Sequence, residues 1–439
     1  MKSILAVQGT DTFKKIDDAY NDNISKSLTD DKKSLFVDFL AYEDYDKALF
    51  VTQALYDSED VSALVKESLK LLSENVESID LEMDEEKASS IANAIYEKNY
   101  KFDTYKTKKE DFVEVSVFNN RTLVPKPVYK KGLDAARDFG NTPANRLTPR
   151  KYAKEIAKLM SGIENMSIRL LDETIILNEK MYSLHSIAKG SAEKPMIVVM
   201  EYRGDAESEE FDALVGKGVT FDAGGISLKP SAKMDEMKFD MCGSAAVVGA
   251  MHAIATSGVK KNVVGIVGLV ENLPSHNAVK PGDVVTSRAG LSIEVLNTDA
   301  EGRMVLCDIM DYVQDKYTVK RMVDVATLTG AIVVCLGDQF AGLFSNSDEL
   351  VENIHKAGDE SSEKYCRMPL CEAYDEQLKG EFGDIRNIGT GSPGASTAAQ
   401  FLQRFVKDGV EWAHLDIAGV ANAKKATGFG VKTLFNLMK

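Results

Sequence analysis

Asn297-Thr298-Asp299-Ala300-Glu301-Gly302-Arg303 is the stretch on which the interpretation of this chain rests. It follows a β-prone run at 291–296 and precedes a run at 304–314 whose apolar residues recur at helical spacing, so a strand-to-helix turn is predicted. In an open α/β sheet, ligands bind at such turns beyond the carboxyl ends of strands. Its two carboxylates can ligate a hard cation, and its arginine can hold an anion. An Asp-x-Glu pair also arises by chance in an acidic chain, so a second cluster is needed.

The surrounding sequence alternates between strand and helix patterns, which predicts a largely parallel sheet covered on both faces. The predicted strands are 198–202, 213–216, 262–270, 292–296, 322–326 and 411–417, and the predicted helices include 244–256, 304–314 and 397–406. Because 439 residues are many for one core, we expect two α/β domains. They are a smaller N-terminal domain over 1–125 with a structural or assembly role, a helical connection over 126–165, and a larger catalytic domain over 166–439 with a mostly parallel central sheet.

In the N-terminal domain, strands are predicted at 4–7, 35–40 and 112–118, and a helix at 85–100.

Composition and net charge argue against several classes of partner. The formal net charge of -15 argues against nucleic acid or an anionic membrane as the main partner, because both require basic surfaces. The apolar run after Met1 is too short for a signal sequence, and no stretch approaches the ~20 apolar residues of a membrane span. A cytoplasmic location is therefore expected.

Cysteine and histidine usage narrows the choice of metal ligands. The five cysteines include no Cys-x-x-Cys pair, which favours a reducing compartment and argues against a thiolate site. The five histidines include no His-x-x-x-His pair. Any metal bound here must therefore depend on carboxylates.

The second cluster lies upstream, within Val215–Pro230 and Met237–Asp240. It places Lys217, Asp222, Lys229 and Asp240 within 24 residues. Glycines flank the first lysine and follow the first aspartate, where the backbone must turn tightly or approach a ligand closely. Taken alone, a lysine at a strand end and a glycine pair are also typical of an ordinary exposed turn.

Together the two clusters resemble those of the cytosolic leucine aminopeptidases, two-metal enzymes that remove N-terminal residues from peptides. The first signature matches without a substitution, and 216–222 with the glycine pair 224–225 and Lys229-Pro230 matches the second. Further matches are 141–145, 280–283, 326–330 and 412–419. The resemblance extends from about residue 130 to the C-terminus and is faint in the first 120 residues. One departure is Cys242, where relatives usually have glycine.

This resemblance implies two divalent cations, Zn²⁺ or Mn²⁺. Asp222 and Glu301 would bridge them, Asp299 would complete one site, and Asp240 with the amine of Lys217 would complete the other. A water activated by the two metals would attack the peptide carbonyl, with Lys229 as an electrophilic catalyst. The resemblance also places a bicarbonate at Arg303 as a proton shuttle.

The resemblance further implies peptide substrates with a free N-terminus and a homohexamer. The residues expected to bind substrate are Met237, Asn297, Thr327, Leu328, Gly330 and Ala418, and their character suits leucine or another apolar first residue. Core packing for Met237 and a plain strand end for Thr327 are the alternatives. His414 and Asp416 are expected to be structural.

Two other functional classes remain open at this point. A two-metal phosphoesterase would also use carboxylates, but it would call for more positive clamps than Lys229 and Arg303. A catalytically silent assembly protein would keep the scaffold and lose metal ligands, whereas all five are present here.

Overall fold

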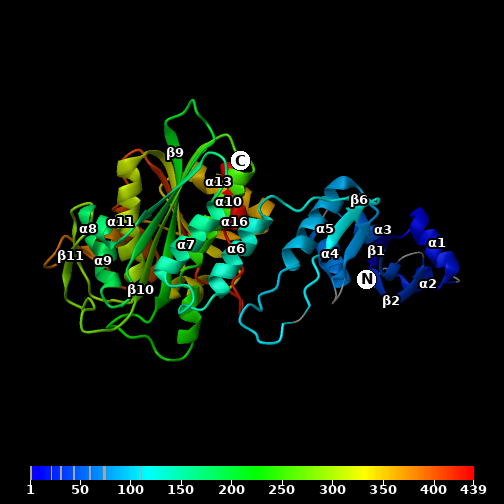
Figure 1. The fold of residues 1–439 in the computed structure, drawn as a ribbon, viewed down its shortest axis with the longest axis horizontal. Helices are drawn as coiled ribbons and strands as arrows, with labels where there is room; N and C mark the ends of the chain where they lie inside the picture. The colour runs from blue at the N-terminus through cyan, green and yellow to red at the C-terminus, as the bar shows by residue number, and fades with distance from the viewer. Residues whose placement is uncertain are drawn as a thin grey trace. The chain divides into compact units, whose positions relative to one another are not determined.

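The structure is a computed structural model that describes residues 2–20, 22–29, 32–42, 45–58, 61–72, 76–109 and 111–439, and for 38–42 the backbone alone. The chain divides into two compact units, 1–130 and 131–439 (Figure 1).

The N-terminal unit is a six-stranded sheet of order β2-β3-β1-β4-β5-β6. Its strands are β1 (Lys2–Val7), β2 (Ser34–Tyr42), β3 (Tyr45–Val51), β4 (Ser78–Leu81), β5 (Ser116–Asn119) and β6 (Thr122–Leu123). Its helices are α1 (Asp11–Ala19), α2 (Asn23–Ser27), α3 (Gln53–Tyr56), α4 (Val61–Ser68) and α5 (Glu85–Lys98), with the 3-10 turn η1 (Leu69–Leu71). Because side chains alternate along a strand, Leu5 and Val7 join the core under α5, whereas Ile4 and Ala6 pack with α1. The predicted elements at 4–7, 35–40 and 85–100 are confirmed, but the strand predicted at 112–118 begins only at Ser116.

The C-terminal unit is built on an eight-stranded sheet of order β15-β14-β17-β13-β9-β10-β8-β7. The strands are β7 (Met166–Leu171), β8 (Met196–Arg203), β9 (Glu210–Asp222), β10 (Asn262–Asn272), β13 (Thr318–Ala326), β14 (Ala341–Ser345), β15 (Tyr365–Arg367) and β17 (Glu411–Asp416). The four central strands, β17, β13, β9 and β10, are parallel, and antiparallel pairs flank them on both sides. The predicted α/β class is confirmed, and the central part of the sheet is parallel as expected.

Helices cover both faces of this sheet (Figure 1). They are α6 (Lys130–Asn141), α7 (Pro149–Met160), α8 (Glu173–Asn178), α9 (Tyr182–Ala188), α10 (Cys242–Thr256), α11 (Glu301–Lys316), α12 (Gly330–Leu336), α13 (Asp348–Ser361), α14 (Glu372–Asp375), α15 (Gly394–Gln403) and α16 (Val431–Met438), with η2 (Met234–Phe239) and η3 (Glu376–Leu378). A Cβ at Gly216 would lie 2.6 Å from Ser244 Cα of α10, whereas one at Gly268 would lie 2.8 Å from Val305 Cγ1 of α11. Missing side chains therefore let the two helices approach opposite faces of the sheet.

The strand before the first signature lies outside this sheet. β12 (Ser292–Glu294) pairs with β11 (Val284–Thr286) and β16 (Ile385–Arg386) in a separate three-stranded sheet. The following helix, α11, begins at Glu301 rather than at Met304. The prediction of a strand-to-helix turn holds, but the turn does not end a strand of the main sheet.

One helical stretch, Met234–Thr256, is long and apolar enough to resemble a membrane span by length and composition, contrary to expectation. Nearly all of its apolar window is buried inside the protein, and α10 packs against β9, β10 and β13. The core helix of a globular unit has these same properties.

Candidate metal centre

The centre lies at the carboxyl edge of the parallel strands. β9 ends at Asp222 beside Asn272, the last residue of β10, and β13 and β17 end in register at Ala326 and Asp416. Asp240 follows η2 just before α10, and Glu301 opens α11. Chain segments that are distant in sequence therefore meet at one edge of the sheet, where α/β folds bind ligands.

Lys217 is the buried centre of the first half of the site. Only 2% of its surface is exposed, and its Nζ lies 2.7 Å from Asp240 Oδ1 and 2.8 Å from Glu301 Oε1. It also donates to the carbonyl of Thr327 at 2.9 Å. Burial lowers its pKa, but the neighbouring carboxylates outweigh burial and raise it overall. Glycine at 302 lets α11 approach the lysine closely, because a Cβ would lie 2.6 Å from the lysine Cε.

Lys229 occupies the second half of the site. Its Nζ lies 2.8 Å from Asp222 Oδ2 and 2.5 Å from Asp299 Oδ1. Gly224 turns the intervening chain with a φ of +88°, and a Cβ there would lie 2.7 Å from Asp299 Oδ1. Burial lowers the pKa of Lys229, but the carboxylates raise it overall. Each lysine thus joins two carboxylates that come from different chain segments.

The carboxylates of the centre form a group of the kind that can bind a cation. Asp222, Asp299 and Glu301 each offer an oxygen atom, and these atoms lie within 4.8 Å of one another. Burial raises the pKa of Asp222, Asp240 and Asp299, and the buried Oδ2 of Asp240 has no hydrogen-bond partner among the described residues. Buried carboxylates with unused oxygens fit hard divalent cations.

Arg303 lies one residue beyond Gly302, near the centre. Its Nη1 donates to the carbonyl of Asn387 at 2.7 Å, and its buried Nε has no hydrogen-bond partner within the described part of the chain. Burial lowers its pKa to about 10, so the guanidinium is charged at neutral pH.

Two asparagines that sequence analysis missed hold the signatures in place. Asn272 Nδ2 donates to Asp222 Oδ1 at 2.8 Å and to the carbonyl of Thr298 at 2.9 Å, so it joins the two clusters. The side chain of Asn387 accepts from the amide of Leu296 at 2.8 Å and donates to the carbonyl of Asn297 at 2.6 Å. Both asparagines are at most 1% exposed. Neither carries a spacing signal, and only their positions at strand ends could have drawn notice.

Several residues predicted to bind substrate also lie beside the centre. Thr327 Oγ1 donates to Asp240 Oδ1 at 2.8 Å, and the amides of Leu328 and Ala418 both donate to Asp416 Oδ1. Gly330 begins α12, and Met237 lies in η2 with its carbonyl accepting from the amide of Asp240 at 3.4 Å. Asn297 Oδ1 accepts from the amide of Asp299 at 2.8 Å and so shapes the turn. Their contact with substrate stays a prediction.

Cys242 opens α10, two residues after Asp240. It is buried, and burial raises its pKa to about 12. The side chain is therefore a neutral thiol at ordinary pH, as expected for a small buried residue.

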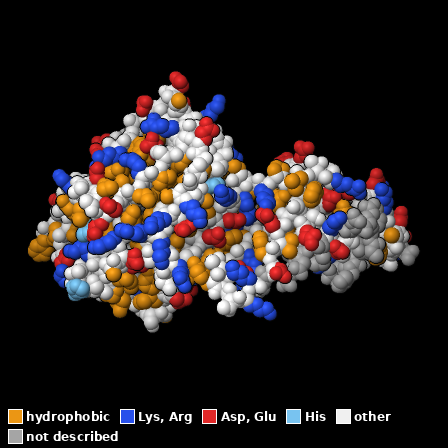
Figure 2. Space-filling model, in the orientation of Figure 1, with side chains coloured by type: hydrophobic (Ala, Val, Ile, Leu, Met, Phe, Trp, Pro, Cys, Tyr) orange, Lys and Arg blue, Asp and Glu red, His pale blue; other side chains and the backbone are white. Residues whose placement is uncertain are grey.

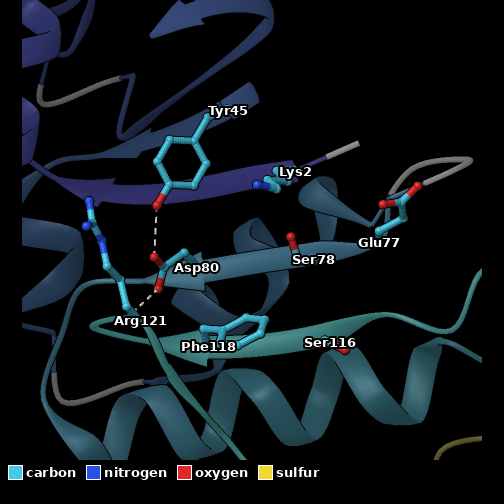
Figure 3. Close-up of a pocket in the computed structure, with 8 residues that line it drawn as sticks. All are labelled: Lys2, Tyr45, Glu77, Ser78, Asp80, Ser116, Phe118 and Arg121. Atoms are coloured by element: carbon cyan, nitrogen blue, oxygen red, sulfur yellow. Dashed lines mark hydrogen bonds between the residues drawn. The ribbon is translucent and has the colours of Figure 1, made fainter. Parts of the chain in front are cut away.

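The N-terminal unit carries an open pocket of about 520 Å³ on one face of its sheet (Figure 3). It is lined by Lys2, Tyr45, Glu77, Ser78, Asp80, Ser116, Phe118 and Arg121. Asp80 already accepts from the Tyr45 hydroxyl at 2.8 Å and from the Arg121 amide at 3.3 Å. Both oxygens of this carboxylate are thus engaged by the protein itself, whereas Asp240 Oδ2 has no hydrogen-bond partner among the described residues.

Figure 2 shows both basic and acidic side chains on the viewed face.

Buried carboxylates and lysines at the carboxyl edge of an α/β sheet form the kind of site that holds divalent cations in metal-dependent enzymes. The sequence model of the cytosol aminopeptidase family, catalytic domain, matches residues 134–435. The chain therefore belongs to the cytosol aminopeptidase family, and it is a hydrolase of the aminopeptidase type. The family is metal-dependent, and the resemblance seen in the motifs is confirmed.

Individual relatives agree with this assignment. A probable cytosol aminopeptidase of Rickettsia bellii (strain OSU 85-389) is 48% identical over 373 residues, covering 80% of this chain and 74% of that protein. The cytosol aminopeptidase of Rickettsia prowazekii (strain Madrid E) is 46% identical over 372 residues, with coverages of 80% and 74%.

Solved structures share the fold over the whole chain. A substitution variant of tomato leucine aminopeptidase superimposes with a TM-score of 0.87 at 28% identity, covering 100% of this chain and 93% of that one. The bottromycin maturation enzyme BotP in complex with Mn gives a TM-score of 0.84 at 28% identity, covering 100% of this chain and 98% of that one.

Proposed function

We propose that this chain uses a pair of divalent cations to remove an apolar first residue, such as leucine, from peptides. The observation that carries the proposal is the position of Lys217, buried between Asp240 and Glu301. All three groups are desolvated there, and buried ion pairs of this kind are often no more stabilising than apolar side chains of similar volume. The arrangement is better explained as a ligand set.

The residues that would hold the cations are Lys217, Asp222, Asp240, Asp299 and Glu301. Their four carboxylates and two dications would balance, provided that Lys217 binds as a neutral amine. Its proton, favoured by the carboxylates alone, would leave when cations neutralise them. When bound, the cations would supply Lewis acidity and lower the pKa of water enough for attack at neutral pH. Zn²⁺ and Mn²⁺ are the proposed ions, and BotP, a structural relative, is a complex with Mn.

Lys229 and Arg303 would supply the fixed positive charges. Lys229 is about one-fifth exposed at its side chain, so its ammonium can turn from Asp222 and Asp299 toward the oxygen of a bound peptide carbonyl. There it would stabilise the negative charge that develops in the transition state. Arg303 would hold bicarbonate, whose planar shape suits the guanidinium, and whose role there would be to carry a proton.

The wall formed by Met237, Thr327, Leu328, Gly330 and Ala418 would receive the first side chain, with Asn297 shaping the adjacent turn. Leucine or a similar residue would suit the apolar part of this wall.

A phosphoesterase is the weaker candidate. Apart from Lys217, the cations that the described residues place near the carboxylates are the guanidinium of Arg303 and the ammonium of Lys229. A transferring phosphoryl group spreads charge over three oxygens and calls for a denser clamp.

The decisive experiment measures hydrolysis of a leucine anilide by protein treated with EDTA, before and after zinc or manganese is restored. We expect activity to vanish and return. Glu301→Gln should stay inactive under both conditions, because it removes the charge of the proposed bridging ligand. Full activity of metal-free Glu301→Gln would eliminate the two-metal proposal.

Two further assignments belong to this proposal. We propose a homohexamer in the cytoplasm, with the N-terminal unit in a structural or assembly role. Light scattering on the full chain tests the assembly state, and a monomer at micromolar concentration would contradict it.

A further inference from the structure

The loops that follow β13 and β17 leave the main sheet next to each other, at the candidate metal centre. β13 and β17 are parallel neighbours, with Ala326 in register with Asp416. The amide of Ile417 donates to the carbonyl of Ala326 at 2.8 Å, so the pairing continues past the strand ends. The segments 327–330 and 417–421 therefore start from a common rigid base. These are the segments that contain Thr327, Leu328, Gly330 and Ala418.

Asp416 ties the two segments together. Its Oδ1 accepts from the amide of Leu328 at 3.0 Å and from the amide of Ala418 at 3.3 Å. Its Oδ2 accepts from the hydroxyl of Thr329 at 2.7 Å. The aspartate is 1% exposed, and Thr329 also accepts from the amide of Ile332 at 3.1 Å, which caps α12. One buried carboxylate thus holds Leu328, Thr329 and Ala418, which belong to both segments.

The same loop reaches the proposed metal ligands. The carbonyl of Thr327 accepts from Lys217 Nζ at 2.9 Å, and its hydroxyl donates to Asp240 Oδ1 at 2.8 Å. Asp416 therefore anchors, at Leu328, the same backbone segment that orients the side chains of Lys217 and Asp240. Asp416 is buried and Thr327 and Leu328 are half-buried, so a shift of the loop would be passed on to Lys217 and Asp240.

We propose that Asp416, acting through Thr329 and the amide of Leu328, is a positioning residue that sets the shape of the pocket for the first side chain of the substrate. The sequence predicts only a structural role for this aspartate. The inference rests on the proposed function for its account of the pocket. It makes Asp416 a determinant of selectivity that touches neither substrate nor cation.

The test uses Thr329→Val, which removes the hydroxyl and keeps the shape of the side chain. Thr329→Ser restores the hydroxyl. Thr433→Val is the matched control, because Thr433 is also buried and donates to a buried carboxylate, Glu363 Oε2, at 2.6 Å, but it lies in α16. The measured quantity is the ratio of kcat/KM for leucine anilide to that for alanine anilide.

We expect Thr329→Val to lower this ratio by about fivefold or more, since a loosened apolar wall loses part of the 10- to 200-fold discrimination such pockets provide. Thr329→Ser should recover the wild-type ratio, and Thr433→Val should leave it unchanged. Equal ratios in Thr329→Val and Thr433→Val would overturn the proposal.

A second readout does not depend on activity. Amide hydrogen exchange in the segment 327–330 should accelerate by about tenfold in Thr329→Val and in Asp416→Asn, but not in Thr433→Val or Glu363→Gln. Unchanged amide hydrogen exchange in both Thr329→Val and Asp416→Asn would overturn the inference. A wild-type protein inactive on both anilides, with exchange behaving as expected, would instead refute the proposed function.

Discussion

Asn272→Ala should damage both the stability and the catalysis of this enzyme, because one amide group joins its two signature clusters. The side chain of Asn272 is 1% exposed and donates to Asp222 Oδ1 at 2.8 Å and to the carbonyl of Thr298 at 2.9 Å. Alanine removes both hydrogen bonds. Asp222 keeps the amide of Gly224 as a donor at 2.9 Å, but its orientation relative to the stretch 297–303 is no longer fixed.

The magnitude follows from the two bonds that are lost. A hydrogen bond to a charged group contributes about 1.5–3 kcal/mol and a neutral one about 1 kcal/mol, so the free energy of unfolding should fall by roughly 2.5–4 kcal/mol. Loss of a partner that orients a metal ligand typically costs about 10- to 100-fold in activity or metal affinity. We expect kcat/KM for leucine anilide to fall within that range.

Asn262→Ala provides the matched control at the other end of β10. Asn262 is 3% exposed, donates to the carbonyl of Ser208 at 2.7 Å and accepts from the amide of Asp205 at 3.1 Å. Urea titration should show that both variants are destabilised, while anilide hydrolysis should be impaired only in Asn272→Ala. If kcat/KM of the two variants agreed within about twofold, well below the expected loss, the link between Asn272 and the centre would be refuted.

Three further outcomes are expected. Lys229→Met should lower kcat for leucine anilide by about 10²- to 10³-fold with little change in fold by circular dichroism, because it would remove the charge that we propose stabilises the transition state. Near-normal kcat would contradict that role. The rate should rise with pH through ~7.7–8.0, because we expect the free α-amine of the substrate to bind one of the proposed cations, which requires its neutral form. A maximum below about pH 6 would count against this. Burial lowers the pKa of His252 from 6.5 to about 4, so the unfolded state binds more protons between these values and stability falls as the pH drops through that window. In the wild-type protein this loss of stability between pH 7 and pH 4 should be on the order of 3 kcal/mol, and His252→Leu should abolish it in melting curves at the two pH values. The same loss of stability in the variant and in the wild type would refute the prediction.

The sequence predicted those features that depend on residues close together in the chain. Alternating strand and helix patterns predicted the class of fold, because burial on both faces of a parallel sheet leaves continuous apolar runs such as 262–270. Lys217, Asp222, Asp240, Asp299 and Glu301 could be nominated from two short stretches, and the structure brings all five together. Their individual roles as ligands stay predictions.

What the sequence could not supply depends on contacts between distant segments. β12 looks like any other strand, and its place in a small separate sheet follows from pairing with the nearby β11 and with Ile385–Arg386, about ninety residues away. The start of α11 was placed too late because Glu301 and Arg303 break the apolar periodicity, yet both are buried. Asn272 and Asn387 each act on a segment remote in the chain, so no local spacing identifies them.

The cluster around Lys217 and Lys229 is costly for the fold, and that cost itself bears on function. Buried ion pairs of this kind are often no more stable than apolar side chains of equal volume, and an unbonded oxygen such as Asp240 Oδ2 adds a desolvation penalty. The backbone is also shaped to admit the cluster, since Gly302 leaves no room for a Cβ beside the lysine. A stretch of sequence that met only the needs of folding would have placed apolar residues here. Its retention of charge, with glycine at the point of closest approach, is what a site prepared for cations requires.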